Sequence, residues 1–236
     1  MATKHMANLA IIPARGGSKR IPRKNIKPFA GKPMVAHSIE AATGSGVFDM
    51  VVVSTDDEEI AAIARGCGAS VPFIRPAELS DDYTPTVPVI AHAIRALAEQ
   101  GRSFECTCCI YPCAPFLQAE DLLGAREVQR ATGAGYCYPV AEFPSVIQRA
   151  LRRLDSGILK PLNPRYEWTR TQDCEAFYYD AGQFYWGCSD AWLQGLGLQS
   201  HGSGLVIPSW RVVDIDTLED WNRAELIFRA LQKASA

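Results

Sequence analysis

The sequence lacks a large excess of charge of either sign, and it lacks a long apolar run. Its 24 Lys and Arg residues nearly balance its 26 Asp and Glu residues, for a formal net charge of -2 at pH 7. This balance argues against a nucleic-acid partner, because domains that bind nucleic acids are usually basic over a whole face. No run is long enough for a membrane-spanning helix and no signal peptide is visible, so we expect a cytoplasmic protein with no membrane partner.

Zinc-ligand spacing, internal repeats and low-complexity segments are missing as well. Cys106 and Cys109 form a C-x-x-C within the run ECTCCIYPCAPF, but no second cysteine pair and no histidine follows at zinc spacing. The run is typical of a buried strand, in which residues three apart point to opposite faces. We therefore expect these cysteines to be small core residues in a reducing compartment.

What the chain does contain is a regular alternation of short apolar runs with helical patterns. This alternation predicts an α/β fold, in which helices cover both faces of a mainly parallel sheet. We take residues 6–235 as one domain and residues 1–5 as a cloning remnant. The predicted strands are 8–14, 50–55, 106–112 and 133–140, and the predicted helices are 33–43, 57–66, 85–100 and 119–131.

The alternation breaks in the second half of the chain. Residues 141–186 are polar at first and then dense in aromatic residues, which indicates a small inserted lobe or an antiparallel excursion. A last strand is predicted at 210–216 and a last helix at 218–233. Thr217 is the expected N-cap of that helix, with Asp220 three residues later.

A basic loop follows the first predicted strand. Residues 11–34 read IIPARGGSKRIPRKNIKPFAGKPM and hold seven Lys and Arg residues between Arg15 and Lys32. Neither G-x-x-x-x-G-K-[S/T] nor G-x-G-x-x-G occurs in it, so the common phosphate loops are excluded. Ligands of open α/β sheets bind beyond the carboxyl ends of the strands, which is where this loop is expected to lie.

The residue types of the loop suit a polyphosphate. Gly16 and Gly17 allow the backbone to turn tightly and to bring amide N–H groups close to an anion. Arg15, Lys19 and Lys24 can add positive charge. A nucleoside triphosphate is the ligand that this pattern predicts, and a solvated basic surface is the alternative.

Two acidic motifs each allow two interpretations. Asp214 and Asp216 stand two apart in a predicted strand, so both carboxylates point the same way and can hold Mg²⁺. The alternative is that they cap the following helix. In STDD (54–57), the acids precede a helix and offset its dipole, with a supporting role near a nucleotide as the second interpretation.

Five segments together resemble one protein family. They are IIPARGGSKRIPRKN, VVVSTDDEEIA, FIRPAELSDDYT, PCAPFL and VVDIDTLEDW, and they cover nearly the whole chain in order. They resemble the CMP–sugar synthetases, cytidylyltransferases that activate nonulosonic acids, and most of all those that use pseudaminic acid. The resemblance implies a Rossmann-like nucleotidyltransferase fold, a homodimer with a dimerisation lobe at 141–186, and a reaction of CTP with the sugar that needs Mg²⁺ and releases pyrophosphate.

The resemblance also implies roles for particular residues. Arg15, Lys24 and Asp216 would be catalytic, and Asp214 and Asp216 would bind the metal. Arg165 is a rival to Arg170 for the sugar carboxylate, a structural ion pair is the alternative for either, and no side chain is an obvious general base. The implied nucleotide contacts are Arg15, Gly16, Gly17, Lys19, Asn25, Arg75 and Thr84, and the implied sugar contacts are Tyr111, Arg170 and Gln183.

The sugar end of the predicted site departs from the sialate synthetases. Many of those carry a Gln and a Ser-Pro-Leu-Arg run where this chain has YPCAPFL (111–117). Six aromatic residues at 177–186 offer apolar surface, which favours pseudaminic acid. The alternatives are a CMP-sialate or CMP-legionaminate synthetase, a CTP-dependent transferase for a shorter keto-sugar, and a nucleotide-binding module without turnover.

Overall fold

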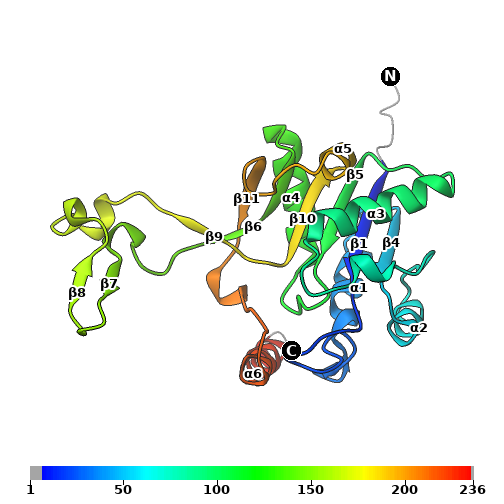
Figure 1. Cartoon of the computed structure of the whole chain (residues 1–236), viewed down its shortest axis with the longest axis horizontal. Helices are drawn as coiled ribbons and strands as arrows, with labels where there is room; N and C mark the ends of the chain where they lie inside the picture. Colours follow the sequence, from blue (N-terminus) through cyan, green and yellow to red (C-terminus); the bar gives the residue numbers. More distant parts are fainter. Residues whose placement is uncertain (1–6, 235–236) are drawn as a thin grey trace.

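A seven-stranded mixed sheet forms the centre of the molecule (Figure 1). The computed structural model describes residues 7–234, so the predicted remnant at 1–5 lies outside the described residues. The strand order is β11-β6-β10-β5-β1-β4, with β9 paired to β6. The strands are β1 (Asn8–Pro13), β4 (Met50–Ser54), β5 (Cys106–Ile110), β6 (Tyr136–Glu142), β9 (Tyr178–Asp180), β10 (Phe184–Cys188) and β11 (Gly202–Val206).

The predicted mainly parallel sheet is confirmed, with one reversal inside it. Strand β1 pairs in parallel with both β4 and β5, and β11 pairs in parallel with β6. Strand β10 is antiparallel to both β5 and β6. Strands β1, β4, β5, β6 and β11 therefore run in one direction, and β9 and β10 run in the other.

Helices cover both faces of this sheet, as the alternation predicts. Leu9 and Ile11 of β1 belong to one buried cluster, which α3 and α5 cover, whereas Ala10 and Ile12 belong to another, which α1, α2 and α4 cover. Burial of this apolar surface is the main term that stabilises the fold. The helices are α1 (Met34–Gly44), α2 (Glu58–Gly66), α3 (Thr86–Glu99), α4 (Ala119–Thr132), α5 (Ser189–Leu193) and α6 (Leu218–Ala234).

The expected role of the cysteines in β5 is confirmed. All five residues of this strand are buried, and Cys106 and Cys109 belong to the clusters on opposite faces of the sheet. No disulfide forms, since all eight cysteines are free and all lie among the described residues.

The predicted strand at 210–216 is wrong. Residues Ser209–Arg211 form a 3₁₀ turn (η5), and the chain from 212 to 216 is not part of the sheet. Val213 and Ile215 pack instead in a third buried cluster, against the basic loop and α6. The strand beside β6 at that end of the sheet is β11, which the sequence pattern does not reveal because it contains two glycines. A Cβ atom at Gly202 would lie 2.5 Å from the Tyr138 ring.

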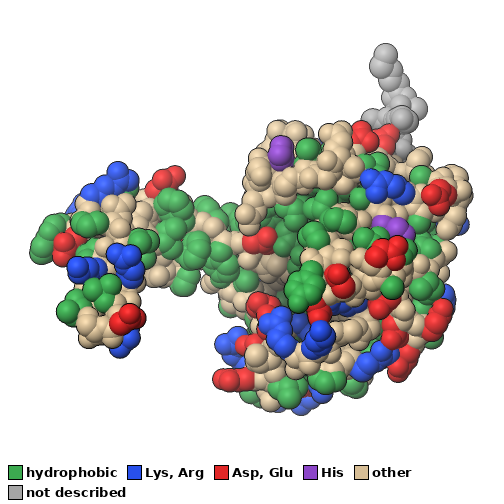
Figure 2. Space-filling model, viewed as in Figure 1, with side chains coloured by type: hydrophobic (Ala, Val, Ile, Leu, Met, Phe, Trp, Pro, Cys, Tyr) green, Lys and Arg blue, Asp and Glu red, His purple; other side chains and the backbone are tan. Residues whose placement is uncertain are grey.

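An arm leaves the body between β6 and β9 (Figure 1). It is residues 143–177, because the two ends of the predicted lobe at 141–186 belong to core strands. Figure 2 shows apolar side chains gathered on this arm and on the neck that joins it to the body. Trp168 is 91% exposed and Leu162 is 66% exposed. The arm contains β7 (Leu151–Arg153), β8 (Leu159–Pro161), and the 3₁₀ turns η2 (Ile147–Arg149), η3 (Pro164–Tyr166) and η4 (Thr171–Asp173).

Three short elements complete the body. Strands β2 (Pro28–Phe29) and β3 (Lys32–Pro33) close the basic loop, and η1 (Ala77–Leu79) precedes α3. Among the helices of the described chain, none is both long and apolar enough to cross a membrane.

Candidate active site

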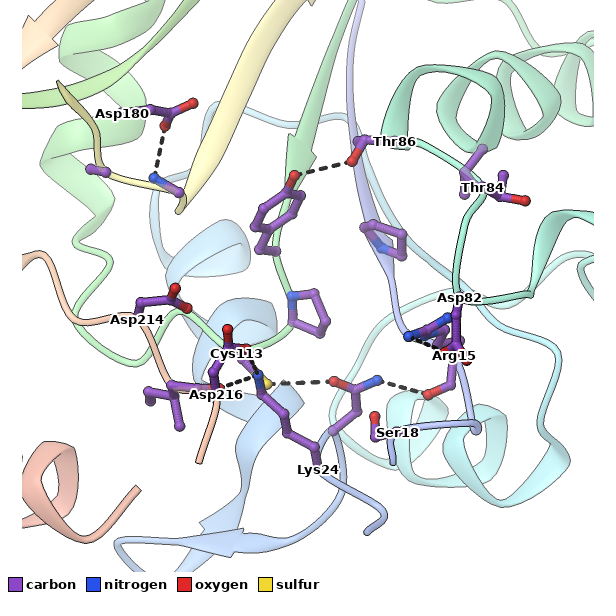
Figure 3. A pocket seen from close by; sticks show the side chains of 18 of the residues that line it. Arg15, Ser18, Lys24, Asp82, Thr84, Thr86, Cys113, Asp180, Asp214 and Asp216 are labelled. Atoms are coloured by element: carbon purple, nitrogen blue, oxygen red, sulfur yellow. Dashed lines mark hydrogen bonds and ion pairs between the residues drawn. The ribbon is translucent and has the colours of Figure 1, made fainter. Parts of the chain in front are cut away.

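A cavity of about 760 Å³ opens at the carboxyl ends of β1 and β5 (Figure 3). Pro13 at the end of β1 lines it, as do the residues that follow β5. This is where an open α/β sheet is expected to bind a ligand. Segments far apart in the sequence meet here and bring together eight of the predicted site residues, which are Arg15, Lys24, Asn25, Arg75, Thr84, Tyr111, Asp214 and Asp216.

The acidic run at 54–57 fixes the basic loop in place. The Gly16 amide donates to Asp56 Oδ1 at 3.0 Å. A Cβ atom at Gly16 would lie 2.7 Å from Asp57 Oδ2, so this position needs a glycine for close packing. The amide of Gly16 is therefore already paired with a carboxylate. The sequence predicts that this amide faces a bound anion in the cavity, and the structure does not place it there.

Asp57 is held by two partners, the start of α2 and Arg23. It is the N-cap of α2 and accepts from the Ile60 amide at 3.0 Å, as expected for an acid at a helix start. Arg23 forms a two-pronged ion pair with it, with Nη1 2.5 Å from Oδ2 and Nη2 3.1 Å from Oδ1. The hydrogen bond from Arg23 lowers the pKa of the Asp57 carboxyl from its ordinary value to about 2. The loop is thus held to the start of α2 by a charged pair.

The cations of the loop face an acidic residue that the sequence analysis does not single out. Arg15 Nη2 lies 2.9 Å from Asp82 Oδ1, and Lys19 forms an ion pair with the other oxygen of the same carboxylate. Arg15 also donates to the Asp81 carbonyl. The Asp82 carboxylate therefore lies between two cations that were predicted to bind an anion. The pair of acids in SDDYT, between Arg75 and Thr84, is the sequence signal for it.

Two of the predicted nucleotide contacts, Arg75 and Asn25, are fixed in place by hydrogen bonds to different partners. Arg75 is only 4% exposed, and its Nε donates to Ser80 Oγ at 3.1 Å. Burial lowers its pKa from the ordinary value, while the Asp56 carboxylate, 3.7 Å away, opposes that shift. Asn25 donates to the Arg15 carbonyl at 2.9 Å and so positions the loop. Arg75 is therefore a buried residue of the cavity wall and not a residue of the outer surface.

Asp214 and Asp216 both line the cavity, although no strand holds them (Figure 3). Ile215 between them is buried in the third cluster, which leaves its two neighbours directed toward the cavity. Asp216 Oδ2 accepts from Arg20 Nη1 at 2.7 Å, and its Oδ1 lies 3.7 Å from Lys24 Nζ.

The alternative role of Asp216 as a helix cap is not seen. The N-cap of α6 is Thr217, as predicted, because its Oγ1 accepts from the Asp220 amide at 3.1 Å. Asp220 in turn accepts from the Thr217 amide at 2.9 Å, which completes a capping box. The Asp216 carboxylate therefore faces the cavity, where Arg20 and Lys24 are its partners.

The donor set of the cavity fits a magnesium ion that is completed by substrate. Within residues 7–234 no group of three or more His, Cys, Asp or Glu side chains is placed to hold a metal. A closed protein cage is therefore absent from that part of the chain. Mg²⁺ characteristically takes one or two carboxylates and fills its other positions with water and phosphate oxygens. Asp214 and Asp216 match that requirement.

The far end of the cavity is formed by tyrosines and one further acid. Tyr111 Oη lies 3.0 Å from Thr86 Oγ1, and the ring of Tyr111 lies beside that of Tyr185. Tyr185 donates to Asp180 Oδ2 at 2.9 Å. Asp180 lines the cavity, and the sequence analysis does not single it out. Among the six predicted aromatics at 177–186, Tyr179 lines the cavity and 184–186 are buried in the core.

Two predicted sugar contacts do not line the cavity of this chain. Gln183 is buried, and its Nε2 donates to the Arg211 carbonyl at 2.8 Å. Arg170 lies on the exposed arm and pairs with Asp173 at 2.9 Å. Its rival Arg165 lies on the same arm, 4.6 Å from the ring centroid of Tyr166. Gly16, Gly17 and Lys19 belong to the basic loop but are not among the residues that line the cavity.

Comparison with known proteins agrees with this geometry. Residues 9–139 match the sequence profile of the cytidylyltransferase family. The pseudaminic acid cytidylyltransferase of Campylobacter jejuni is 42% identical over 225 residues, which cover 95% of this chain and 97% of that protein. The CMP-N,N'-diacetyllegionaminic acid synthase of Legionella pneumophila is 31% identical and covers 97% of this chain and 99% of its own length.

Comparison with a solved structure supports the fold and nothing beyond the fold. The CMP:2-keto-3-deoxy-manno-octonic acid synthetase complexed with CTP superposes with a TM-score of 0.68 at 15% identity, over 98% of this chain and all of that one. This likeness confirms the expected Rossmann-like nucleotidyltransferase fold. From its sequence match and its fold, the chain belongs to the cytidylyltransferase family of nucleotidyltransferases.

Proposed function

We propose that this enzyme transfers CMP from CTP to pseudaminic acid and releases pyrophosphate. The observation that best supports this choice of substrate is the 42% identity, over nearly the full length of both chains, to an enzyme named for that sugar. The cavity supports it, because one end is lined by cations and the other by tyrosine rings and a carboxylate. In this reaction the anomeric hydroxyl oxygen of the sugar attacks the α-phosphorus and gives its proton to water. The bond from the α-phosphorus to the oxygen that bridges to the β-phosphorus breaks in line, and pyrophosphate leaves with that oxygen.

The basic end of the cavity would hold the triphosphate. Arg15, Lys19 and Lys24 would donate to its oxygens, and Arg15 and Lys19 would exchange the Asp82 carboxylate for phosphate. Arg75, Asn25 and Thr84 lie on the same side of the cavity and would contact the nucleoside. Catalysis by this chain would rest on positioning and charge neutralisation, since groups fixed before the reaction act strongly on developing charge.

Asp214 and Asp216 would hold Mg²⁺ together with phosphate oxygens. When bound, the ion would neutralise charge on the α-phosphate and on the leaving pyrophosphate. Arg20 and Lys24 form ion pairs with the Asp216 carboxylate and hold it in position at the cavity. Lys24 also donates to the Ile215 carbonyl and so ties the basic loop directly to the acidic segment.

The tyrosine end of the cavity would hold the sugar. Pseudaminic acid carries an acylamido group and a terminal methyl where sialic acid carries hydroxyl groups. Tyr179 and Ala181 line that end and offer it apolar surface. Asp180 offers an acceptor for an N–H or O–H donor of the sugar.

We also propose a homodimer in which the arm of one subunit reaches the cavity of the other. The arm leads away from its own cavity, exposes several apolar side chains, and carries both arginines that were predicted to bind the sugar carboxylate. On this proposal residues 6–235 are one catalytic domain and the arm is its dimerisation lobe. Free cysteines throughout fit a cytoplasmic enzyme.

The experiment is pyrophosphate release with CTP, Mg²⁺ and a panel of purified nonulosonic acids. Release that depends on pseudaminic acid, with a CMP-sugar of matching mass, would support the proposal. A nucleotide-binding module would bind CTP and release none. The second candidate is a CMP-legionaminate synthetase, because a synthase of that name matches nearly the full chain at 31% identity; faster turnover with the legionaminic acid would favour it.

A further inference from the structure

A second cavity, of about 500 Å³, lies at the opposite end of the sheet from the active site. Cys106 is the first residue of β5 and Cys188 is the last residue of β10, and both line this cavity. The active-site residues follow the other end of β5. The second cavity is therefore separate from the chemistry described above.

The two thiols lie directly opposite each other on neighbouring strands. The antiparallel register of β10 and β5 places Cys188 across from Cys106. The Ser189 amide donates to the Glu105 carbonyl at 3.0 Å, which makes the cysteines a non-hydrogen-bonded pair. The Cα atoms of such pairs are about 4.5 Å apart, with both side chains on one face of the sheet. Disulfides span Cα separations of roughly 4.4–6.8 Å, so rotation of the side chains suffices to join these sulfurs.

The surroundings make one thiol accessible and favour its thiolate. Cys188 is exposed, whereas Cys106 is only 4% exposed. Gln129 Nε2 donates to Cys188 Sγ at 3.7 Å. The hydrogen bond from the Cys106 thiol lowers the pKa of Cys188 and outweighs the effect of burial, and the charge of Arg126 acts in the same direction against Asp190.

Arg126 is a buried cation beside this pair. It is 7% exposed, packs over the Trp186 ring at 5.7 Å, and donates to Gln129 Oε1 at 3.3 Å, and no carboxylate within residues 7–234 forms an ion pair with it. A guanidinium in this position stabilises negative charge in the cavity. Low-pKa, accessible thiols that lie next to a second cysteine are the ones that peroxides oxidise most readily.

We propose that Cys106 and Cys188 are a peroxide-sensitive thiol pair that closes to a disulfide. The Cys188 thiolate attacks one oxygen of hydrogen peroxide, the O–O bond breaks, and the departing hydroxide takes a proton to become water. The Cys106 sulfur then attacks the sulfenic sulfur of Cys188 and displaces hydroxide, which takes the Cys106 proton and leaves as a second water. Two thiols are oxidised, one peroxide is reduced, and thiol reductants reverse the bridge.

The test treats the reduced full chain with one to two equivalents of hydrogen peroxide, alkylates it, and maps disulfides in non-reducing digests by mass spectrometry. We expect a Cys106–Cys188 linked peptide to accumulate before Cys67 or Cys174 lose alkylation, and to vanish with dithiothreitol. The partly exposed Cys174 supplies a matched control, since Cys174→Ser should form the same bridge at the same rate.

Two variants separate the steps. Cys106→Ser should stop at a sulfenic acid on Cys188, trapped as a dimedone adduct on that peptide. Cys188→Ser, a change at an exposed position, should abolish the bridge and leave Cys106 reduced at the same peroxide dose. Earlier oxidation of another cysteine, or over-oxidation of Cys188 in the wild-type chain without a bridge, would overturn the proposal.

Discussion

Arg15 and Asp82 form an ion pair at the active-site cavity, with Nη2 2.9 Å from Oδ1. Lys19 binds the other oxygen of the same carboxylate. The site thus contains its own anion, placed between the cations that we assign to the triphosphate. On the proposed assignment, CTP would replace one set of charged contacts with another, so its affinity should depend on both Arg15 and Asp82.

The Arg15→Ala variant should bind CTP at least about tenfold more weakly. A hydrogen bond to a charged group contributes about 1.5–3 kcal/mol, and the variant loses that contact to phosphate. Asp82→Asn is the matched control: it removes the competing charge and should bind CTP as tightly as the wild type or a few-fold more tightly, because partly exposed ion pairs contribute about 0–1 kcal/mol. Isothermal titration calorimetry measures both, and unchanged affinity together with unchanged rates in Arg15→Ala would contradict its role.

Asp214→Ala and Asp216→Ala should each lose most CMP-sugar formation and keep a near-native melting temperature. Both carboxylates line the cavity, and neither caps the following helix, whose cap is Thr217. Thr217→Ala serves as the contrast, since loss of a cap should cost about 1 kcal/mol of stability and leave the metal ligands in place. The metal assignment fails if both Asp variants retain Mg²⁺-dependent turnover.

The part of the Asp57 contribution to stability that depends on its charge should be lost at low pH. Its folded-state pKa of about 2 lies below the ordinary value of 3.8, so the ionised carboxylate stabilises the fold above pH 4 and this term is lost as the pH falls through 2. Asp57→Asn keeps a good N-cap residue and removes only the charge that pairs with Arg23. We expect it to be less stable than the wild type by about 1 kcal/mol at pH 7. Urea unfolding at pH 7 and near pH 2 should show that difference shrink, and a difference that persists at low pH would exclude the charged pair as its source.

Arg211→Met should destabilise the protein by about 3–5 kcal/mol, because it leaves the buried Asp121 charge without its partner. Arg211 Nη1 lies 2.6 Å from Asp121 Oδ2, and Nη2 lies 2.9 Å from Oδ1. The double variant Asp121→Leu with Arg211→Met removes both charges and should recover much of the loss. Denaturant unfolding gives all three values, and a fully stable single variant would show that this pair does not hold the segment before Asp214.

Much of the fold was predictable because its strands are apolar runs at regular spacing. β1, β4 and β5 are buried on both faces and read clearly, whereas β11 reads Gly-Ser-Gly-Leu-Val and was missed. Its glycines are needed for close approach to β6, and that requirement depends on a neighbour distant in sequence. The antiparallel direction of β10 was not predictable either, because it depends on how the long arm connects β6 to β9 and β10.

Residue type and position in the sequence predict that Arg15, Lys24 and the two acids at 214 and 216 share one site, and the structure does bring them to the same cavity. Asp82 and Asp180 were missed because each looks like an ordinary loop acid until the fold brings it to the cavity. Arg170 illustrates the opposite limit: its partner in this chain is Asp173, and the role predicted for it would be possible only in the proposed dimer.

The most direct test of the account is turnover per enzyme with CTP, Mg²⁺ and each of three purified sugars: pseudaminic acid, sialic acid and legionaminic acid. Burying an additional methyl group contributes about 0.8 kcal/mol, and each hydroxyl left unpaired against an apolar wall costs about 1–3 kcal/mol. These terms predict a kcat/KM for pseudaminic acid that exceeds the value for sialic acid by roughly a hundredfold or more. Equal or higher kcat/KM with sialic acid would contradict the proposed substrate, and no pyrophosphate release with any of the three would contradict the proposed reaction.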